Sequence, residues 1–333
     1  MSSRTRYVLL GGGAVLLVGL LAGGVAYVQG GIPAFAVARP AQPGLAELRY
    51  VPAEASFVAY ASVRDVMQSN LRERLGVAQP DVDRQGRFFD ETGVDLENDI
   101  DHIVAGFVST GTEPPAGLVL LTGRFDHSRL ESLAREQGGA VEEYEGHTLV
   151  TRAMGHDETE LAMSFVESGV LALGSDESVR HAIDVSSGRA QETDITSNDR
   201  LMALMTHVGE TDNAWAIAQL EGNEVLEMLP GDFAAQIPPL TAIVFGGRVT
   251  DGLSATLTAE TRDDQSSQDL RDVLQGFAAL ARMQTDTRPH LRALLDSVQV
   301  GGSERAVSLS FDFQSENLEG AFSESEPEPD ELR

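Results

Sequence analysis

Short runs in which apolar and polar residues alternate are the clearest folding signal in the chain. Residues 253–260 (LSATLTAE) alternate with a period of two, which indicates a strand that buries one face. Asp251-Gly252 joins this run to the apolar run 241–249, and Asp-Gly between two such runs predicts a two-residue β-hairpin. Residues 307–313 (VSLSFDF) repeat the alternation. We therefore predict antiparallel sheet toward the C-terminus. Shorter apolar runs predict further strands at 56–63, 103–109, 117–123, 147–152, 161–166, 170–174 and 213–220.

Helical periodicity lies between the predicted strands. The apolar stripe that starts at Leu270 and ends at Ala281 follows the i, i+3, i+4, i+7 spacing and predicts a long amphipathic helix from Ser266. A shorter helix is predicted after Asp126, a residue type that caps helix N-termini, and it ends before Gly138-Gly139. Two more helices are predicted directly after strands, at 64–75 and 221–229.

The order of the predicted elements repeats along the chain. In each half a strand runs into a helix, a pair of strands follows, and then come a second helix and further strands. Segments 56–63 (SFVAYASV) and 213–220 (NAWAIAQL) share the same rhythm, although the spacing between the halves is not constant. The prediction is an α+β protein with a largely antiparallel sheet and helices packed on one face, a β-α-β-β-α-β-type unit used twice. The two units are assigned to 49–195 and 196–314.

The N-terminus predicts a membrane anchor. Tyr7–Val28 is a 22-residue apolar stretch, and a helix needs about 20 residues to cross a bilayer. A cleaved signal peptide has a shorter apolar region of about 7–15 residues, and the cleavage-like Ala36-Val37-Ala38 lies ten residues beyond the stretch. We therefore favour a retained anchor over residues 1–29. Arg4 and Arg6 precede the span, which favours a cytoplasmic N-terminus and an extracytoplasmic bulk.

The predicted span carries small residues at helix-contact spacing. Gly19 and Gly23 form a GxxxG pair, and Ala22 with Ala26 continues the pattern. Small residues let two membrane helices approach closely, although glycine is also frequent in membrane spans for other reasons. These four residues are the candidate helix–helix contact with a membrane-protein partner.

The segments that flank the folded part have a linker composition. Residues 30–48 are rich in Gly, Ala and Pro, with prolines at 33, 40 and 43, and predict an extended stalk. Residues 315–333 form an acidic tail that has too few apolar residues to order itself.

The charge and the missing residue types exclude several functions. The chain has 52 Asp and Glu against 24 basic residues, a formal net charge of −28. It has no cysteine, and every basic residue is arginine, which rules out thiol chemistry, Cys-ligated metals and any role that needs lysine. The acidity argues against nucleic acid and anionic lipid as partners. It indicates either a surface that recruits a basic partner or cations, or simply a well-solvated surface.

Two segments carry a resemblance to known proteins. Residues 50–60 (YVPAEASFVAY) and 91–101 (ETGVDLENDID) resemble a group of uncharacterised bacterial proteins. Members of that group are exported, membrane-anchored and built from repeated α+β modules. The resemblance therefore implies the same architecture, but it implies no activity and no functional residues.

Candidate chemistry along the chain is weak. Residues 81–86 (DVDRQG) begin like an EF-hand loop, but the twelfth position is Thr92 where the loop needs glutamate, so we favour the polar start of a helix. Four acids (Asp95, Glu97, Asp99 and Asp101) could bind a cation, but the favoured alternative is the first turn of a helix. The seven histidines lack metal-ligand spacing, and Trp215 is expected in the core.

These features lead to three functional hypotheses. The first is a non-catalytic, membrane-anchored extracytoplasmic protein that binds or scaffolds a partner, for example in a complex of the cytoplasmic or inner membrane. The second is a module that binds an apolar small molecule or lipid. The third, least favoured, is a hydrolase that uses Asp, Glu, His or Ser with a metal. We expect no cofactor.

Overall fold

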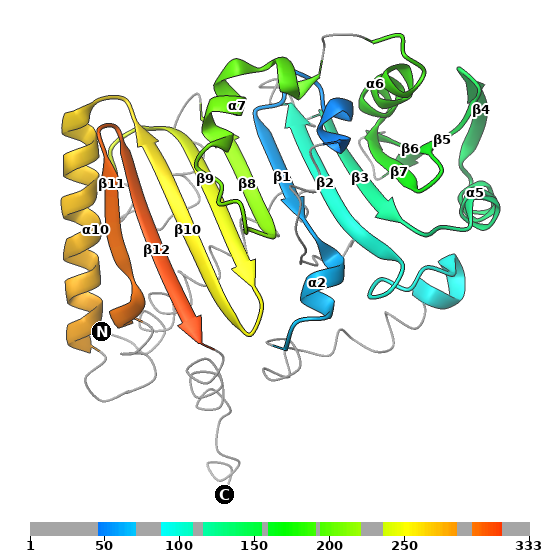
Figure 1. Ribbon diagram of the computed structural model, residues 1–333. Helices are drawn as coiled ribbons and strands as arrows, with labels where there is room; N and C mark the ends of the chain where they lie inside the picture. The colour runs from blue at the N-terminus through cyan, green and yellow to red at the C-terminus, as the bar shows by residue number, and fades with distance from the viewer. Residues whose placement is uncertain are drawn as a thin grey trace, which may run out of the picture.

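The computed structural model describes residues 46–70, 88–108, 116–154, 159–190, 194–220, 236–284 and 295–314. The protein is an α+β protein with a large antiparallel sheet, as the sequence predicts (Figure 1). The strands are β1 (Phe57–Ala61), β2 (Ile100–Val108), β3 (Ala116–Gly123), β4 (Ala140–Tyr144), β5 (His147–Met154), β6 (Thr159–Glu167), β7 (Val170–Ser175), β8 (Ala214–Gln219), β9 (Leu240–Val249), β10 (Gly252–Thr261), β11 (Gln299–Ser303) and β12 (Ala306–Gln314). The helices are η1 (Glu47–Tyr50), α2 (Val63–Met67), α5 (His127–Glu136), α6 (Asp176–Ser186), η2 (Ile195–Ser197), α7 (Asp199–Met205) and α10 (Asp264–Gln284). Residues 88–92 and 295–297 are also helical and border segments outside the described ranges.

Within these residues, all strands belong to one sheet of 12 strands, and neighbouring strands pair antiparallel. The β1–β8 pair lies inside the sheet, with Ala59 opposite Ala216. Outward from this pair the order is β1-β2-β3-β7-β6 on one side and β8-β9-β10-β12-β11 on the other. Helices α5 and α10 follow β3 and β10 along the chain, so they take the same place in each half. The first half carries the additional strands β5 and β4 at its outer edge.

Local sequence accounts for the elements that were predicted. Strands β9 and β10 form the hairpin predicted at Asp251-Gly252. Val249 lies opposite Leu253, however, so three residues (250–252) separate the paired positions, and the predicted two-residue turn is wrong. The carboxylate of Asp126 accepts a hydrogen bond of 3.0 Å from the Arg129 N–H, so Asp126 is the N-cap of α5. Helix α10 begins at Asp264, close to the predicted start. The predicted helix 64–75 begins as α2, whereas positions 71–75 and the whole predicted helix 221–229 lie outside the described residues.

Side chains of neighbouring strand residues point to opposite faces of the sheet, so we name the faces after two residues of β1. On the Tyr60 face, Leu118 and Leu120 of β3 pack against Val179, Ala182 and Ile183 of α6, in a core that also contains residues of η1, η2 and α7. On the Ala59 face, Val63 of α2 and Leu130 of α5 pack against Phe165 and Leu171. A second cluster on that face joins Ala216, Phe245, Ala255 and Phe311.

The prediction that helices pack on one face only is therefore wrong. Helices α6 and α2 lie against opposite faces of the same sheet. The reason is visible in β3, where residues 118–121 (LVLL) are apolar at every position. A strand without a polar side needs cover on both faces.

One row across the sheet shows how the Tyr60 face changes character. Cross-strand partners place Tyr60, Trp215, Gly246, Thr256, Ser310 and Gln299 side by side on β1, β8, β9, β10, β12 and β11. The row begins with a buried, stacked Tyr60–Trp215 pair and ends with hydroxyl and amide side chains. Figure 1 shows α10 beside the β11 edge and no labelled helix drawn across β10 and β12. This part of the Tyr60 face is where the candidate site lies.

No helix in the described ranges is long and apolar enough to cross a membrane. The predicted span Tyr7–Val28 falls within residues 1–45, outside those ranges.

Candidate functional site

A polar hollow lies on the Tyr60 face at β10, β12 and β11. Its volume is about 240 Å³, and it is open to solvent on one side. The strands place their polar side chains there by register, because Ser254 pairs with Asp312 and Thr256 pairs with Ser310. The full lining is Asp212, Ser254, Ala255, Thr256, Ser297, Gln299, Ser310, Phe311 and Asp312. Since the strands alternate, Ala255 and Phe311 point their side chains to the other face and their backbones contribute to the hollow.

Asp212 is the residue from outside these strands whose carboxylate reaches the hollow. It lies in the loop between α7 and β8, where its Oδ2 accepts a 2.7 Å hydrogen bond from the Gly209 N–H. The carboxylate lies over Gly246 of β9, and a Cβ built at that glycine would be 2.1 Å from Oδ2. Gly246 therefore leaves the space that Asp212 occupies.

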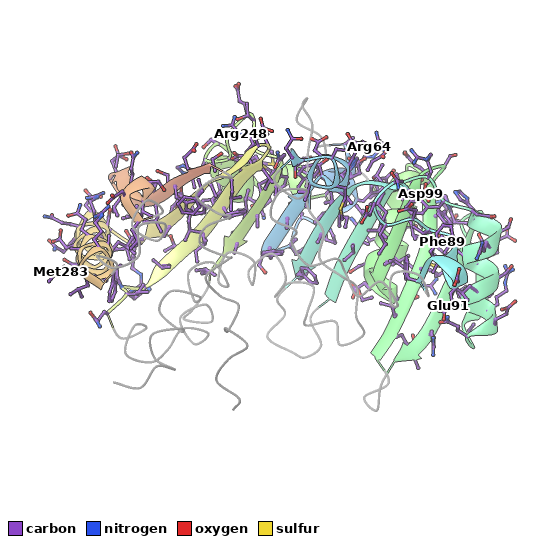
Figure 2. All side chains as sticks on the ribbon, turned by 90° about the horizontal axis from the view of Figure 1, so that it is seen from below. Arg64, Phe89, Glu91, Asp99, Arg248 and Met283 are labelled. Carbon is purple, nitrogen blue, oxygen red and sulfur yellow. The ribbon has the colours of Figure 1, made fainter. Side chains whose placement is uncertain are left out.

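The electrostatic environment of Asp212 is unfavourable to its charge. Burial raises the pKa of Asp212, and this outweighs the hydrogen bond from Gly209 and the positive charge of Arg248, which lower it. Arg248 itself donates to the Thr211 hydroxyl at 3.1 Å. Figure 2, in which the sheet is turned by 90°, shows Arg248 on the upper side of the sheet, far from Phe89 and Glu91. A carboxylate that loses hydration on folding gains from a cationic ligand.

The lining favours polar binding. It offers two carboxylates, hydroxyls on both central strands and one amide, and none of the described lining residues is basic. The described lining contains no histidine beside its serines, so it provides no Ser–His pair for nucleophilic catalysis. The arrangement can accept several hydrogen bonds from a cation or from a polar polypeptide surface.

A second polar cluster fastens η1 to the sheet. Glu47 Oε1 lies 3.1 Å from His102 Nε2 and 3.4 Å from the Thr122 hydroxyl. Burial raises the pKa of Glu47, but the hydrogen bond and charge of His102 outweigh it, so this pKa is lowered overall. The ring of Tyr60 lies between Trp215 and His102, and burial raises the pKa of Tyr60 to about 12. Because its side chains are largely enclosed, we interpret this cluster as one that holds η1 on the sheet.

The other end of η1 is attached in the same way. Tyr50 donates a 2.7 Å hydrogen bond to Glu167 Oε1, and Arg49 forms an ion pair with the same carboxylate. Burial, followed by the hydrogen bond to Glu167, raises the pKa of Tyr50 to about 12. Segment 46–50 is therefore held on the sheet at both ends.

Three of the four acids that were weighed as a cation site, with the first turn of a helix favoured over it, make local structural contacts. Asp95 Oδ1 accepts hydrogen bonds from the Glu97 and Asn98 N–H groups and closes a turn. Asp99 pairs with Arg124 and Asp101 with Arg64. A strand, β2, follows at Ile100, so the alternative interpretation as the first turn of a helix is wrong. No group of three or more potential ligands able to hold a metal occurs in the part of the chain that the structure describes.

The remaining sequence candidates are scattered. The His127 ring stacks on Phe165 at 3.7 Å, and His147 Nδ1 lies 2.8 Å from the Phe165 carbonyl oxygen. Burial lowers the pKa of His181. Trp215 is 5% exposed and belongs to the core, as predicted.

Several predictions fall outside the described residues. They are the membrane-contact residues Gly19, Ala22, Gly23 and Ala26, the EF-hand-like segment 81–86, His156 and His290.

Sequence reasoning missed the hollow. The alternating hydroxyls of 253–260 and 307–313 identify a polar face on each strand. Which strands pair, and which loop reaches over their neighbour, is not contained in either run. Asp212 lies in a polar loop (GETDN) that a sequence analysis assigns to a turn.

No protein-family model and no curated protein matches the chain. Among solved structures, one described as "Structure of crystal form I of TP0453" is similar, with 12% sequence identity and a TM-score of 0.46. The match covers 83% of this chain and 96% of that chain. The similarity is too distant to assign a function.

Proposed function

We propose that the protein is a membrane-anchored, extracytoplasmic, non-catalytic binding protein. It docks a partner protein on the exposed hydroxyl-rich part of the Tyr60 face, as an accessory or scaffolding subunit of a membrane complex. The span 7–28 holds it at the membrane, and the stalk carries the folded part away from the bilayer. The stalk ends before η1, because Leu48 of η1 is buried in the core, so the expected boundary at 48 is too late. Gly19 and Gly23, with Ala22 and Ala26, provide a second contact with a membrane-embedded partner.

The observation that carries this proposal is that the Tyr60 face is apolar and covered by a helix in one half of the sheet and hydroxyl-rich in the other. On β3 and β7 the Tyr60 face is apolar and covered by α6, whose Val179, Ala182 and Ile183 are fully buried. On β10 and β12 the same face carries Ser254, Thr256, Ser308 and Ser310, all only partly buried, and Thr258, which is buried. Burying a large apolar side chain stabilises a fold by about 1.5–3 kcal/mol, a gain that hydroxyls do not offer. A hydroxyl-rich face stays hydrated in the free protein and exchanges water for polar groups of a partner.

The matching strand order of the two halves supports a duplication in this proposal. The described strands β1, β2, β3, β7 and β6 of the first half match β8, β9, β10, β12 and β11 of the second in order, and the two halves differ on the Tyr60 face. One copy closed that face with α6, and the other kept it open for a partner. The alternative of an apolar ligand fits the hollow less well, because hydroxyls, carboxylates and an amide line it.

The test is a mild-detergent purification of the full-length protein with mass spectrometry of the retained proteins. We expect a stoichiometric membrane-protein partner with the natural protein and its loss with Ser310→Tyr, which places a bulky side chain in the hollow. Gln268→Tyr, at an exposed position of α10, is the matched control and should keep the partner. Circular dichroism checks that both variants are folded. A protein that purifies alone, or a partner that Ser310→Tyr retains, would refute the proposal.

A further inference from the structure

The two edges of the sheet differ in what lies beside them. At one edge α10 lies beside β11 and contacts it, whereas β4 forms the other edge with no described strand beyond it (Figure 1). We propose that β4 accepts an extended, basic segment of a partner polypeptide, which adds to the sheet as an antiparallel strand. Strand β4 lies at the opposite end of the sheet from the hollow, so this contact is independent of the docking surface proposed above.

The hairpin between β4 and β5 determines which backbone groups of β4 face outward. Tyr144 pairs with His147 across a two-residue turn whose residues both have positive φ, as a type I′ turn requires. The residues that flank such a turn form a hydrogen-bonded pair, and these pairs alternate with non-hydrogen-bonded pairs along the ladder. Tyr144 and Glu142 therefore bond to β5, whereas the N–H and C=O groups of Val141 and Glu143 point away from it. No hydrogen bond from another described segment reaches these outward groups.

The side chains of β4 differ between the two faces. On the Tyr60 face they are fastened to α6, because Glu142 forms an ion pair with Arg180 and the Tyr144 hydroxyl donates a 3.1 Å hydrogen bond to a carboxylate of that helix. On the opposite face Val141 and Glu143 are exposed, and neither side chain has an ion pair or hydrogen bond within the described residues. The strand is therefore held in its extended form, which lowers the entropic cost of adding another strand to it.

The outward positions specify the sequence of the added strand. The exposed Val141 can pack against an apolar residue directly opposite it, and Glu143, on the same face, favours a residue of opposite charge. The chain directions are opposed in an antiparallel pair. The partner segment therefore carries a basic residue opposite Glu143 and an apolar residue two positions later, opposite Val141. Hydrogen bonds between the main chains supply the affinity, and these two side-chain contacts supply the specificity.

A second copy of this chain fits the edge less well. Charged side chains on an edge strand are a common protection against pairing with identical chains, and each copy carries a net charge of −28. That charge repels another copy, but it attracts a basic segment and steers its approach. The acids of β4 therefore disfavour self-association without closing the edge to a basic partner.

The experiment uses the full-length protein in nanodiscs of uncharged phosphatidylcholine. The probe is the peptide acetyl-Thr-Arg-Thr-Val-Thr-amide, and binding is measured by NMR line broadening at low salt. The first comparison peptide is N-methylated at its arginine and valine, which removes both N–H donors and keeps both side chains. We expect it to bind at least about tenfold more weakly, since each lost hydrogen bond leaves a carbonyl of β4 without its partner. A peptide with glutamate in place of arginine should also bind at least about tenfold more weakly, because like charges directly opposite each other repel.

Variants locate the binding on β4. Val141→Pro removes an outward N–H, a change that an edge strand tolerates, and should weaken the arginine peptide at least about fivefold. Val141→Thr keeps the N–H and the branched side chain and should change the affinity by less than about twofold. Glu143→Gln should weaken binding about threefold, whereas Asp272→Asn, which removes a charge from an exposed position of α10, should leave it unchanged. Circular dichroism checks that each variant is folded, and mass photometry counts the copies in each nanodisc.

Each contrary result overturns the inference. Absence of arginine-peptide binding, or equal binding of the N-methylated peptide, would show that no strand is added. Undiminished binding by Val141→Pro, or equal weakening by Asp272→Asn, would show that the peptide binds elsewhere. Equal binding of the glutamate peptide would overturn the choice of a basic segment. Two copies per nanodisc that become one with Val141→Pro would assign the edge to a second copy of this chain. The proposed function is judged separately by the Ser310→Tyr purification, because that variant changes the other end of the sheet.

Discussion

Gly246 and Asp212 form a pair whose coupling can be measured. Gly246 lies in β9, and the carboxylate of Asp212 occupies the space where a side chain would be. The perturbation is Gly246→Ala, which adds one methyl group. Gly246 is not among the residues with positive φ, so the backbone itself accepts alanine.

The structure sets the size of the effect. The new Cβ would lie 2.1 Å from Asp212 Oδ2, a separation that real Cβ atoms essentially never show. Asp212 must move by roughly 1 Å to reach ordinary contact, and this breaks its 2.7 Å hydrogen bond with the Gly209 N–H. Overpacking typically destabilises by about 1–3 kcal/mol, so we expect Gly246→Ala to lower the free energy of unfolding by about 2 kcal/mol.

A double-mutant cycle isolates the contact. In an Asp212→Ala background the space above Gly246 is empty, and Gly246→Ala should then lower the free energy of unfolding by less than about 0.5 kcal/mol. The coupling energy should be about 1.5 kcal/mol or more, well above the deviation of roughly 0.3–0.5 kcal/mol expected for independent sites.

Urea unfolding of the full-length protein in nanodiscs measures these values. Trp215, the only tryptophan, is buried in β8 directly opposite Gly246, so its fluorescence reports on the fold. Far-UV circular dichroism checks that the fluorescence change follows global unfolding. An equal loss of stability from Gly246→Ala with and without Asp212 would refute the placement of the carboxylate over this glycine.

The remaining predictions concern the core and pH. Ile183→Ala, at a fully buried position of α6, should lower the free energy of unfolding by about 2–5 kcal/mol. The control Glu177→Ala, at an exposed position of α6, should change it by less than about 0.5 kcal/mol. Urea titrations measure both values, and equal effects would contradict the packing of α6 on the sheet. Because the pKa of Glu47 is lowered by His102 despite its burial, their pair should stabilise the fold above the ordinary pKa of Glu47 and lose this contribution as the pH falls through the lowered value. Glu47→Gln should remove that part of the acid-side dependence in thermal melts, and an unchanged profile would contradict the pairing. Because burial raises the pKa of Asp212, its contribution should be favourable at low pH and be lost as the pH rises through the raised value. Thermal melts of Asp212→Asn against the natural protein should therefore show the variant gaining relative stability over that rise, and a constant difference would exclude the burial effect.

Strands in which apolar and polar residues alternate were predictable from sequence, and strands without this alternation were not. The runs at 253–260 and 307–313 became β10 and β12 because alternation decides which side chains can be buried together. Strands β4 (AVEEY) and β11 (QVGGS) at the two sheet edges have too few apolar residues to show alternation. Their pairing depends on the neighbouring strand, which supplies the hydrogen-bond partners.

The candidate site shows the same division. Its hydroxyls were visible in sequence as the polar positions of two strands, whereas the acids at 95–101 looked more like a ligand set. The fold uses those acids in a turn and in ion pairs with Arg124 and Arg64. Sequence spacing of acids does not determine which cation lies beside them after folding.

The amino-acid sequence by itself determined the α+β class, the hairpin at Asp251-Gly252 and the cap at Asp126, because each depends on residues close together in the chain. It also determined the charge that disfavours nucleic acid. Only the tertiary structure decided that helices cover both sheet faces, and that Asp212 lies over Gly246 beside Ser254, Thr256, Ser310 and Asp312. The physical reason is that cross-strand register and loop placement come from contacts between segments far apart in sequence, which no local pattern encodes.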